Sequence, residues 1–258
     1  MSTSSTQSSA VRDTSHLAGL YDALFLRLAR ELPSRYEGLG LTACGAAVGS
    51  RWAGELLICG RAVNGWEEEP WFAHHANKSE VRHDLASRAL AGWTADPCPM
   101  RWVTDLWHHQ TEYNTARSAF WRVVQAVTTG LGIANKTEEL WSSHIAWTNL
   151  YRVAPHAGGN PSGDLQALQR EASTDLLKAE LALLQPRRVL FLTGAGWATP
   201  ILANLSAFTL TATGSKLVQM VGSTEESSER RGKIVIAAHP QGKPEAEMVR
   251  EILSAFEA

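Results

Sequence analysis

Cysteine is scarce in this sequence, and the three that occur, Cys44, Cys59 and Cys98, lie far apart. They form no CxxC pair and no four-ligand cluster, so a disulfide framework is not expected. Cys98, His108 and His109 match no familiar metal-ligand spacing, and we predict no metal site. Such cysteine usage suits a reducing compartment, and we expect a cytoplasmic protein.

Long apolar runs are also lacking. No stretch approaches the roughly 20 apolar residues that span a bilayer. The first residues are rich in Ser, Thr and Gln, without the charged start and apolar centre of a secretion signal. We therefore expect no membrane association, a disordered tail over residues 1–14 and a single domain over residues 15–258.

An excess of charge of one sign is the third absence. The formal net charge is only −2, so any DNA-binding surface has to be a local patch. Tryptophan, by contrast, is abundant. Ten of them offer ample surface on which a nucleic-acid base can stack, although most are expected in the core.

What the chain does contain is a series of short apolar runs that alternate with helical stripes. Continuous apolar runs are typical of strands buried on both faces, and the stripes predict helices. The expected strands cover 56–59, 144–153, 188–193 and 233–238, and the expected helices cover 17–32, 114–131, 164–185 and the residues after Pro244. This alternation predicts an α/β fold, a three-layer α/β/α sandwich around a central, mainly parallel four-stranded sheet.

Three further segments complete this interpretation. A short helix is expected around 200–205 and an edge strand or hairpin over 208–221. Residues 38–53 receive no assignment. Residues 67–110 show no clear period, and we interpret them as a lid or as a channel for a substrate strand, since so long an irregular segment is more often functional than idle.

Each predicted strand is followed by a glycine or a polar residue. Asn64 follows the first, Asn149 lies near the end of the second, Gly194 follows the third and His239 follows the fourth. A parallel sheet brings these ends to one edge, where α/β proteins bind their ligands. Taken singly, each has an ordinary explanation, as Asn64-Gly65 is a common turn pair. Their order along the chain is the informative feature.

That order resembles the uracil-DNA glycosylase superfamily. In this family one strand ends in a Gly-led water-activating motif, a second in an Asn that reads the pyrimidine, a third in Gly and a fourth in His-Pro-Ser. The similar stretches here are, in turn, L-L-I-C-G-R-A-V-N-G (56–65), I-A-W-T-N-L-Y-R-V (145–153), R-V-L-F-L-T-G (188–194) and I-V-I-A-A-H-P-Q-G-K (234–243). The resemblance covers about residues 55–243, but only the strand-end motifs carry it.

The resemblance implies a DNA glycosylase-like hydrolase that flips out and excises uracil or a modified pyrimidine. Asn149 would read the base with its amide, and His239 would stabilise charge on the departing base. Asn64 would position water. The remaining implied contacts are Gly60, Trp66 and Trp71 in the base pocket and Lys243, Gln241 and Gly194 on the nucleic acid. No cofactor is required, and we expect a monomer that binds DNA.

The sequence departs from the family pattern at the water-activating motif. Ala62 stands where Asp or Asn is usual, and Arg61 stands where one branch has Glu. Gln241 replaces the Ser after His-Pro, and the usual intercalating Leu is absent. The candidates for a replacement water activator are Asn64 and the carboxylates of Glu67, Glu68, Glu69 and Asp84.

These departures leave two other hypotheses open. One is a nucleic-acid-binding protein without catalysis, and the other is an enzyme that processes nucleosides or nucleotides at the same edge. A basic groove beside the pocket favours the DNA-directed hypotheses, whereas a closed, uncharged pocket favours the small-molecule enzyme.

Overall fold

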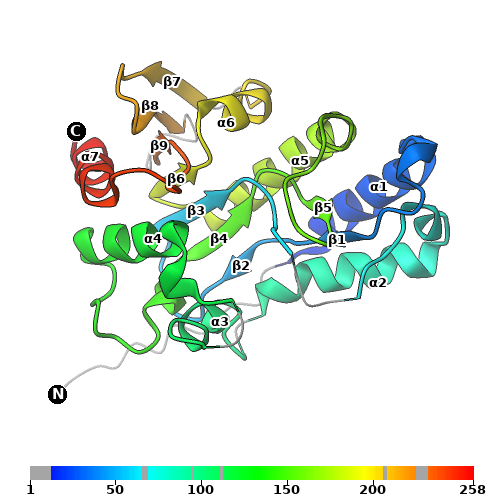
Figure 1. Cartoon of the computed structure of the whole chain (residues 1–258), viewed down its shortest axis with the longest axis horizontal. Coiled ribbons are helices and arrows are strands. Elements are labelled where there is room, and N and C mark those ends of the chain that lie inside the picture. The colour runs from blue at the N-terminus through cyan, green and yellow to red at the C-terminus, as the bar shows by residue number, and fades with distance from the viewer. Residues whose placement is uncertain (1–12, 66–68, 95, 111–112, 206–207, 225–231) are drawn as a thin grey trace.

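Figure 1 shows the computed structural model of the chain, which describes residues 13–65, 69–94, 96–110, 113–205, 208–224 and 232–258. Residues 1–12 of the predicted tail lie outside the described residues, as do Trp66, Glu67 and Glu68.

The described residues form a mixed seven-stranded sheet in the order β2-β4-β3-β6-β9-β8-β7. The strands are β2 (Ala47–Val48), β3 (Leu56–Gly60), β4 (Ala146–Asn149), β6 (Arg188–Leu192), β7 (Phe208–Ala212), β8 (Val218–Thr224) and β9 (Lys233–Ala237). The four strands expected from the apolar runs, β4, β3, β6 and β9, are neighbours and pair in parallel. Strands β2, β8 and β7 extend this group with antiparallel pairs. The predicted α/β class is therefore confirmed, but the predicted four-stranded sheet is corrected to a mixed seven-stranded one.

Helices lie on both faces of the sheet. On one face pack α4 (Ala119–Gly130) and α7 (Glu245–Glu257), and on the other pack α5 (Gly163–Leu184) and α6 (Ala195–Leu202). Successive side chains of a strand point to opposite faces. In β3, Leu56 and Ile58 join the cluster under α4 and α7, whereas Leu57 and Cys59 join the cluster under α5 and α6. This double burial explains why the strand is apolar without alternation.

A third cluster lies beside the sheet, between α1 (Ser15–Glu31), α2 (Ser79–Leu90) and α5. A two-stranded sheet of β1 (Leu41–Ala43) and β5 (Val153–Pro155) adjoins it. The remaining elements are short: η1 (Ser34–Tyr36), η2 (Ala73–Asn77), η3 (Ala91–Trp93), α3 (Arg101–Asp105), η4 (Thr115–Arg117) and η5 (Trp141–His144).

Three predicted segments differ from the structure. The helix expected over 114–131 is divided into η4 and α4, because the backbone of Ser118 between them is extended, and Asn114 caps only the 3-10 turn. The strand expected over 144–153 is divided into β4 and β5, which belong to different sheets. The helix expected over 200–205 is α6, which begins earlier, directly after Gly194.

The largest correction concerns residues 67–110, which are not an irregular lid over their whole length. They contain α2, whose buried residues are Leu85, Ala86 and Ala89. Two of these are alanines, so the apolar stripe is weak in the sequence. An ion pair between Arg82 and Asp22, 2.8 Å long, also holds α2 to α1. In the described part of the chain, no helix has the length and apolar character needed to cross a membrane.

Candidate active site

The four parallel strands end at one edge of the sheet, and the residues that follow them form the candidate site. Gly60 at the end of β3 is in register with Asn149 at the end of β4. After β6, the backbone N–H of Gly194 donates to the carbonyl oxygen of Ala237 at the end of β9, over 2.8 Å. His239 follows two residues later. The predicted residues Gly60, Asn149, Gly194 and His239 therefore lie along the same edge.

Asn149 is held tightly against Gly60. Its side-chain Nδ2 donates to the sulfur of Cys44 over 3.3 Å, and the residue is only 1% exposed. A Cβ atom on residue 60 would overlap Oδ1 of Asn149 and approach the indole of Trp147 to 3.6 Å. Glycine at this position thus makes room for the Asn149 amide, which gives the Gly60–Asn149 pair a physical basis.

Arg61 occupies the position directly beyond β3. Its Nε donates to the carbonyl oxygen of Thr193 at the end of β6, over 2.8 Å. Its guanidinium carbon lies 5.1 Å from the ring centroid of Trp197, in a cation–π contact. Burial lowers the pKa of Arg61 from its usual range. The site therefore has a fixed cation directly beyond β3.

His239 is half-buried beside this cation. The backbone N–H of Gln241 donates to its Nδ1 over 3.3 Å, which leaves Nε2 as the protonated nitrogen of the neutral ring. Burial and, to a smaller extent, the positive charge of Arg61 lower the pKa of His239 below its ordinary value of 6.5. The ring is therefore neutral near pH 7, and Nε2–H is a donor available to a ligand.

Asn64 is exposed, and its side chain already has a partner. Its Oδ1 accepts from the backbone N–H of Gly159 over 2.7 Å, which ties the loop after β3 to the loop after β5. Gly158 and Gly159 have φ values of 97° and 91°, which favour glycine. The amide nitrogen and the second lone pair of Oδ1 remain to orient a water molecule.

Gly194 is the N-cap residue of α6 and has a φ of 83°, a conformation that favours glycine. The next backbone N–H, that of Ala195, donates to Oε1 of Gln219 from β8 over 2.7 Å. The first turn of α6 is therefore partly capped from within the protein. Gln219 was not expected at this edge, because its strand was predicted only as part of an edge hairpin.

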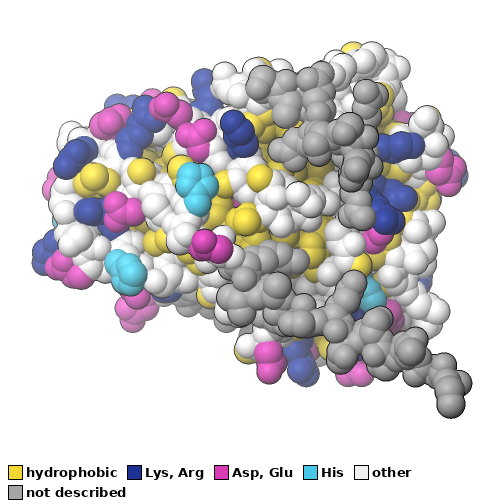
Figure 2. Space-filling model, turned by 180° about the vertical axis from the view of Figure 1, so that it is seen from behind, with side chains coloured by type: hydrophobic (Ala, Val, Ile, Leu, Met, Phe, Trp, Pro, Cys, Tyr) yellow, Lys and Arg dark blue, Asp and Glu magenta, His cyan; other side chains and the backbone are white. Residues whose placement is uncertain are grey.

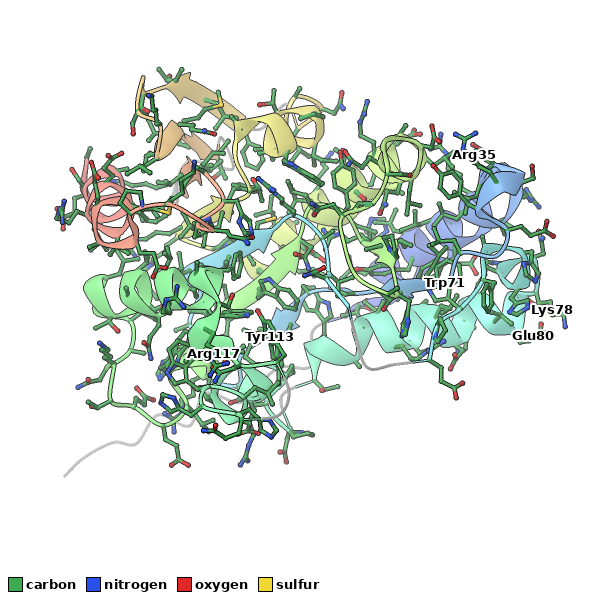
Figure 3. The ribbon with its side chains drawn as sticks, viewed as in Figure 1. Arg35, Trp71, Lys78, Glu80, Tyr113 and Arg117 are labelled. Atoms are coloured by element: carbon green, nitrogen blue, oxygen red, sulfur yellow. The ribbon has the colours of Figure 1, made fainter. Side chains whose placement is uncertain are left out.

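The two predicted stacking tryptophans have different outcomes. Trp66 lies outside the described residues. Trp71 is only 6% exposed and packs edge-on against Phe25, with ring centroids 5.3 Å apart. Figure 3 shows it on the side of the molecule formed by α1 and α2. Trp71 is a core residue there, and its rings have no face free for a base.

Two aromatic residues at the edge were missed. Phe120 from α4 lies 6.4 Å from His239, measured between ring centroids, and Trp197 lies under Arg61 and against Tyr151. Trp197 had a sequence signal, since it directly follows the Gly-Ala-Gly run after the third strand. Phe120 had none, because the sequence placed it only on an inward helical stripe.

Lys243 and Gln241 are exposed in the turn that follows His239. This turn is closed by the backbone N–H of Lys243, which donates to the carbonyl oxygen of Pro240 over 3.0 Å. Both side chains face solvent beside the site. Of the other carboxylates considered, Asp84 lies on α2 and pairs with Arg88 over 2.9 Å, and Glu69 is exposed.

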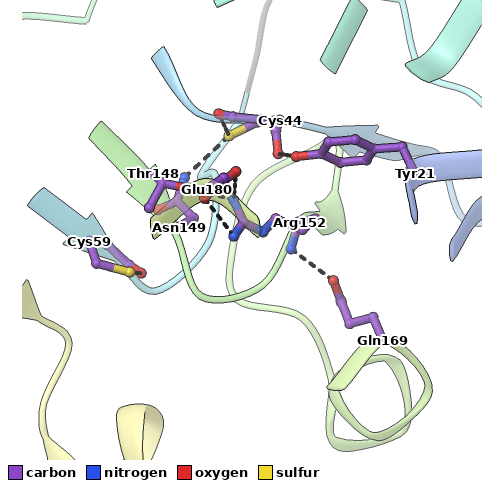
Figure 4. Close-up of polar contacts among 10 residues, drawn as sticks. Tyr21, Cys44, Cys59, Thr148, Asn149, Arg152, Gln169 and Glu180 are labelled. Atoms are coloured by element: carbon purple, nitrogen blue, oxygen red, sulfur yellow. Dashed lines mark hydrogen bonds and ion pairs between the residues drawn. The ribbon is translucent and has the colours of Figure 1, made fainter. Parts of the chain in front are cut away.

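A fully buried ion pair lies behind Asn149 (Figure 4). The two terminal nitrogens of Arg152 donate to the two carboxylate oxygens of Glu180, over 2.8 and 2.9 Å. Thr148, next to Asn149, donates to Glu180 over 2.9 Å, and Gln169 accepts from the backbone N–H of Arg152 over 2.9 Å. Burial raises the pKa of the Glu180 carboxyl, and the Arg152 guanidinium opposes this rise. The network fixes the chain on both sides of Asn149.

The site contains a cation and neutral donors. Among the described residues, no carboxylate pairs with Arg61 or His239, and no group of His, Cys, Asp and Glu side chains could hold a metal ion. Neither a protein-family model nor a curated protein matches this chain.

Proposed function

We propose that this protein is a DNA glycosylase-like hydrolase that excises a pyrimidine from DNA, acting as a monomer in the cytoplasm with a single domain of the uracil-DNA glycosylase type. The observation that carries the proposal is the pairing of Asn149 with Gly60 at the strand edge that also holds His239. An amide with one acceptor and two donors suits a pyrimidine edge. A neutral imidazole donor suits the oxygen on which charge develops.

In this mechanism the bond between C1′ of the sugar and N1 of the base breaks, and its electron pair leaves with the base. The Nε2–H group of His239 stabilises the negative charge that develops on the base oxygen. Water then bonds to C1′ and releases a proton, so that a free base and an abasic sugar result. The side chain of Asn149 is buried against Gly60 and Cys44, so it has to move when the base binds.

The lack of a water-activating group lowers the reaction rate less if the C1′–N1 bond is largely broken before water attacks. The rate then depends mainly on stabilising the departing base, and water needs only to be positioned. The free amide nitrogen of Asn64 can do this while Oδ1 stays bound to Gly159. An amide cannot remove a proton, so Asn64 acts as a positioning group in this scheme.

The test is single-turnover release of bases from duplexes that carry uracil or hypermodified pyrimidines. His239→Ala should lower the rate about 100- to 1,000-fold while DNA binding stays nearly unchanged, because the donor acts mainly in the transition state. Asn149→Ala should also weaken discrimination between bases. His83→Ala is the matched control, since His83 is exposed on α2. Equal rates for wild type and His239→Ala would remove His239 from the mechanism.

The second candidate is a DNA-binding protein without catalysis. It is favoured by Ala62 in the usual place of the water activator and by the engagement of Asn64 Oδ1 with Gly159. This protein would bind DNA and release no base from any substrate. A third candidate, an enzyme acting on free nucleosides or nucleotides, would act on those small molecules and show no affinity for DNA.

A further inference from the structure

Arg61 is the most unusual charged residue at the strand edge. Many arginines in the described residues pair with a carboxylate: Arg27, Arg35, Arg51, Arg82, Arg88, Arg101, Arg122, Arg152, Arg187 and Arg188. Five described arginines have no such partner. Four of them are exposed, namely Arg30, Arg117, Arg170 and Arg250, and the fifth is Arg61. Arg61 alone among them is partly buried and lacks a carboxylate. A partly buried cation without a counter-charge is a favourable place for an anion to bind.

The side chain of Arg61 is also held in place. Its Nε is bound to the carbonyl oxygen of Thr193, and its planar face lies on Trp197, which in turn packs edge-on against Tyr151 with centroids 5.7 Å apart. These contacts use one nitrogen and one face. Among the described residues, no acceptor binds its two terminal nitrogens, which remain to donate to a ligand.

These terminal nitrogens face the strand edge. A Cβ atom added to Gly194 would lie 3.9 Å from Nη2 of Arg61 and 3.7 Å from Oε1 of Gln219, so the absence of a side chain at Gly194 leaves space beside the guanidinium. The charge of Arg61 also acts on His239. Arg61 and Gly194 thus lie side by side beyond β3 and β6, and His239, beyond β9, is near enough to be affected by the charge of Arg61.

We propose that Arg61 is a catalytic residue that binds the anionic oxygen of the departing pyrimidine, together with His239. This inference rests on the proposed glycosylase function and deepens it. As the C1′–N1 bond breaks, its electron pair spreads over N1 and the adjacent oxygen of the base, where Arg61 and Nε2–H of His239 donate hydrogen bonds. Water supplies the oxygen that bonds to C1′, and its proton neutralises the base before release. The substrate class favoured is a pyrimidine that forms a stable anion.

The first measurement does not require any excision. The wild-type protein is titrated near neutral pH with 5-nitrouracil, which is an anion there, and with uracil and thymine, which are neutral. Binding is followed by calorimetry. Wild type should prefer the anion by about 10- to 100-fold, as expected for a charge-assisted hydrogen bond. Arg61→Gln should lose this preference, whereas Arg61→Lys should keep part of it. Arg250→Gln, the same charge change at an exposed residue of α7, should behave as wild type.

The second measurement is single-turnover excision from duplexes with 5-substituted uracils whose bases differ in acidity. Arg61→Gln should slow poor leaving groups more than good ones. Circular dichroism confirms that each variant is folded. The inference is overturned if wild type shows no preference for the anion, or if Arg61→Gln keeps that preference. It is also overturned if Arg61→Gln slows the excision of all substrates equally. An Arg61-dependent anion preference without base release from any DNA would uphold the anion site and reject the glycosylase function.

Discussion

At the scale of single residues, His239 is defined by what surrounds it. Burial and the nearby charge of Arg61 both disfavour its protonated form, and the N–H of Gln241 occupies Nδ1. We expect NMR titration of the His239 ring to give a midpoint below 6.5. Arg61→Gln should raise the midpoint only part of the way, because burial remains. A midpoint at or above the ordinary histidine value would contradict this account.

The same shift has a consequence for stability, with a defined sign. His239 binds a proton less readily in the folded protein than in the unfolded chain. Its stabilising contribution to the free energy of unfolding is therefore complete above pH 6.5. It is lost as the pH falls through the lowered native pKa. His239→Gln should flatten this part of the pH dependence.

The residue types at the strand ends were predictable, but their contacts were not. The order of Gly60, Asn149, Gly194 and His239 placed them at one edge, and the parallel pairing of their strands agrees. Trp71 was misplaced because the bridge between it and Leu41 carries it into the core beneath α1. That bridge joins distant segments and leaves no local pattern in the sequence.

At the scale of elements, long periodic segments were predicted well and short ones were not. Helices α1, α5 and α7 and the four parallel strands have clear apolar patterns. Strands β1 and β2 have three and two residues, too few for a period to appear. Helix α2 buries mainly alanines, and its stability depends on packing and on an ion pair with α1. Such contacts join residues far apart in the chain, so the local sequence pattern does not predict them.

The buried pair of Arg152 and Glu180 gives the prediction at this scale, because it joins α5 to the segment after β4. Glu180→Gln should lower the free energy of unfolding by about 3–5 kcal/mol, since it leaves a buried guanidinium without a counter-charge. Denaturant unfolding measures this loss.

The control is Glu171→Gln. Glu171 lies on α5, as Glu180 does, and is an exposed partner of Arg27, so its replacement should have little effect. Replacing both buried partners with apolar residues, Arg152→Met with Glu180→Leu, should recover part of the loss. Equal losses for Glu180→Gln and Glu171→Gln would contradict the role assigned to the pair.

At the scale of the whole molecule, the charge is balanced and its arrangement matters more than its sum. The formal net charge is −2, and on the face shown in Figure 2 basic and acidic side chains are interspersed. Attraction to a polyanion must therefore come from a few residues close to the site. Under the proposed function, these residues are Arg61 at the strand ends and Lys243 in the exposed turn beside them.

The last prediction follows from this distribution. DNA affinity should fall as salt rises, because phosphate contacts release counterions. Lys243→Ala should weaken binding to a similar degree for all sequences and reduce the slope of log affinity against log salt by about 1. Lys136→Ala is the matched control, since Lys136 is exposed in the connection from α4 to β4, at the opposite edge of the sheet. Fluorescence anisotropy with labelled duplexes at several salt concentrations measures both quantities. Because only a few cations contribute on a molecule of balanced charge, the slope should be shallow. An affinity insensitive to salt, or equal losses in the two lysine variants, would argue against a phosphate contact by Lys243 and in favour of a small-molecule ligand.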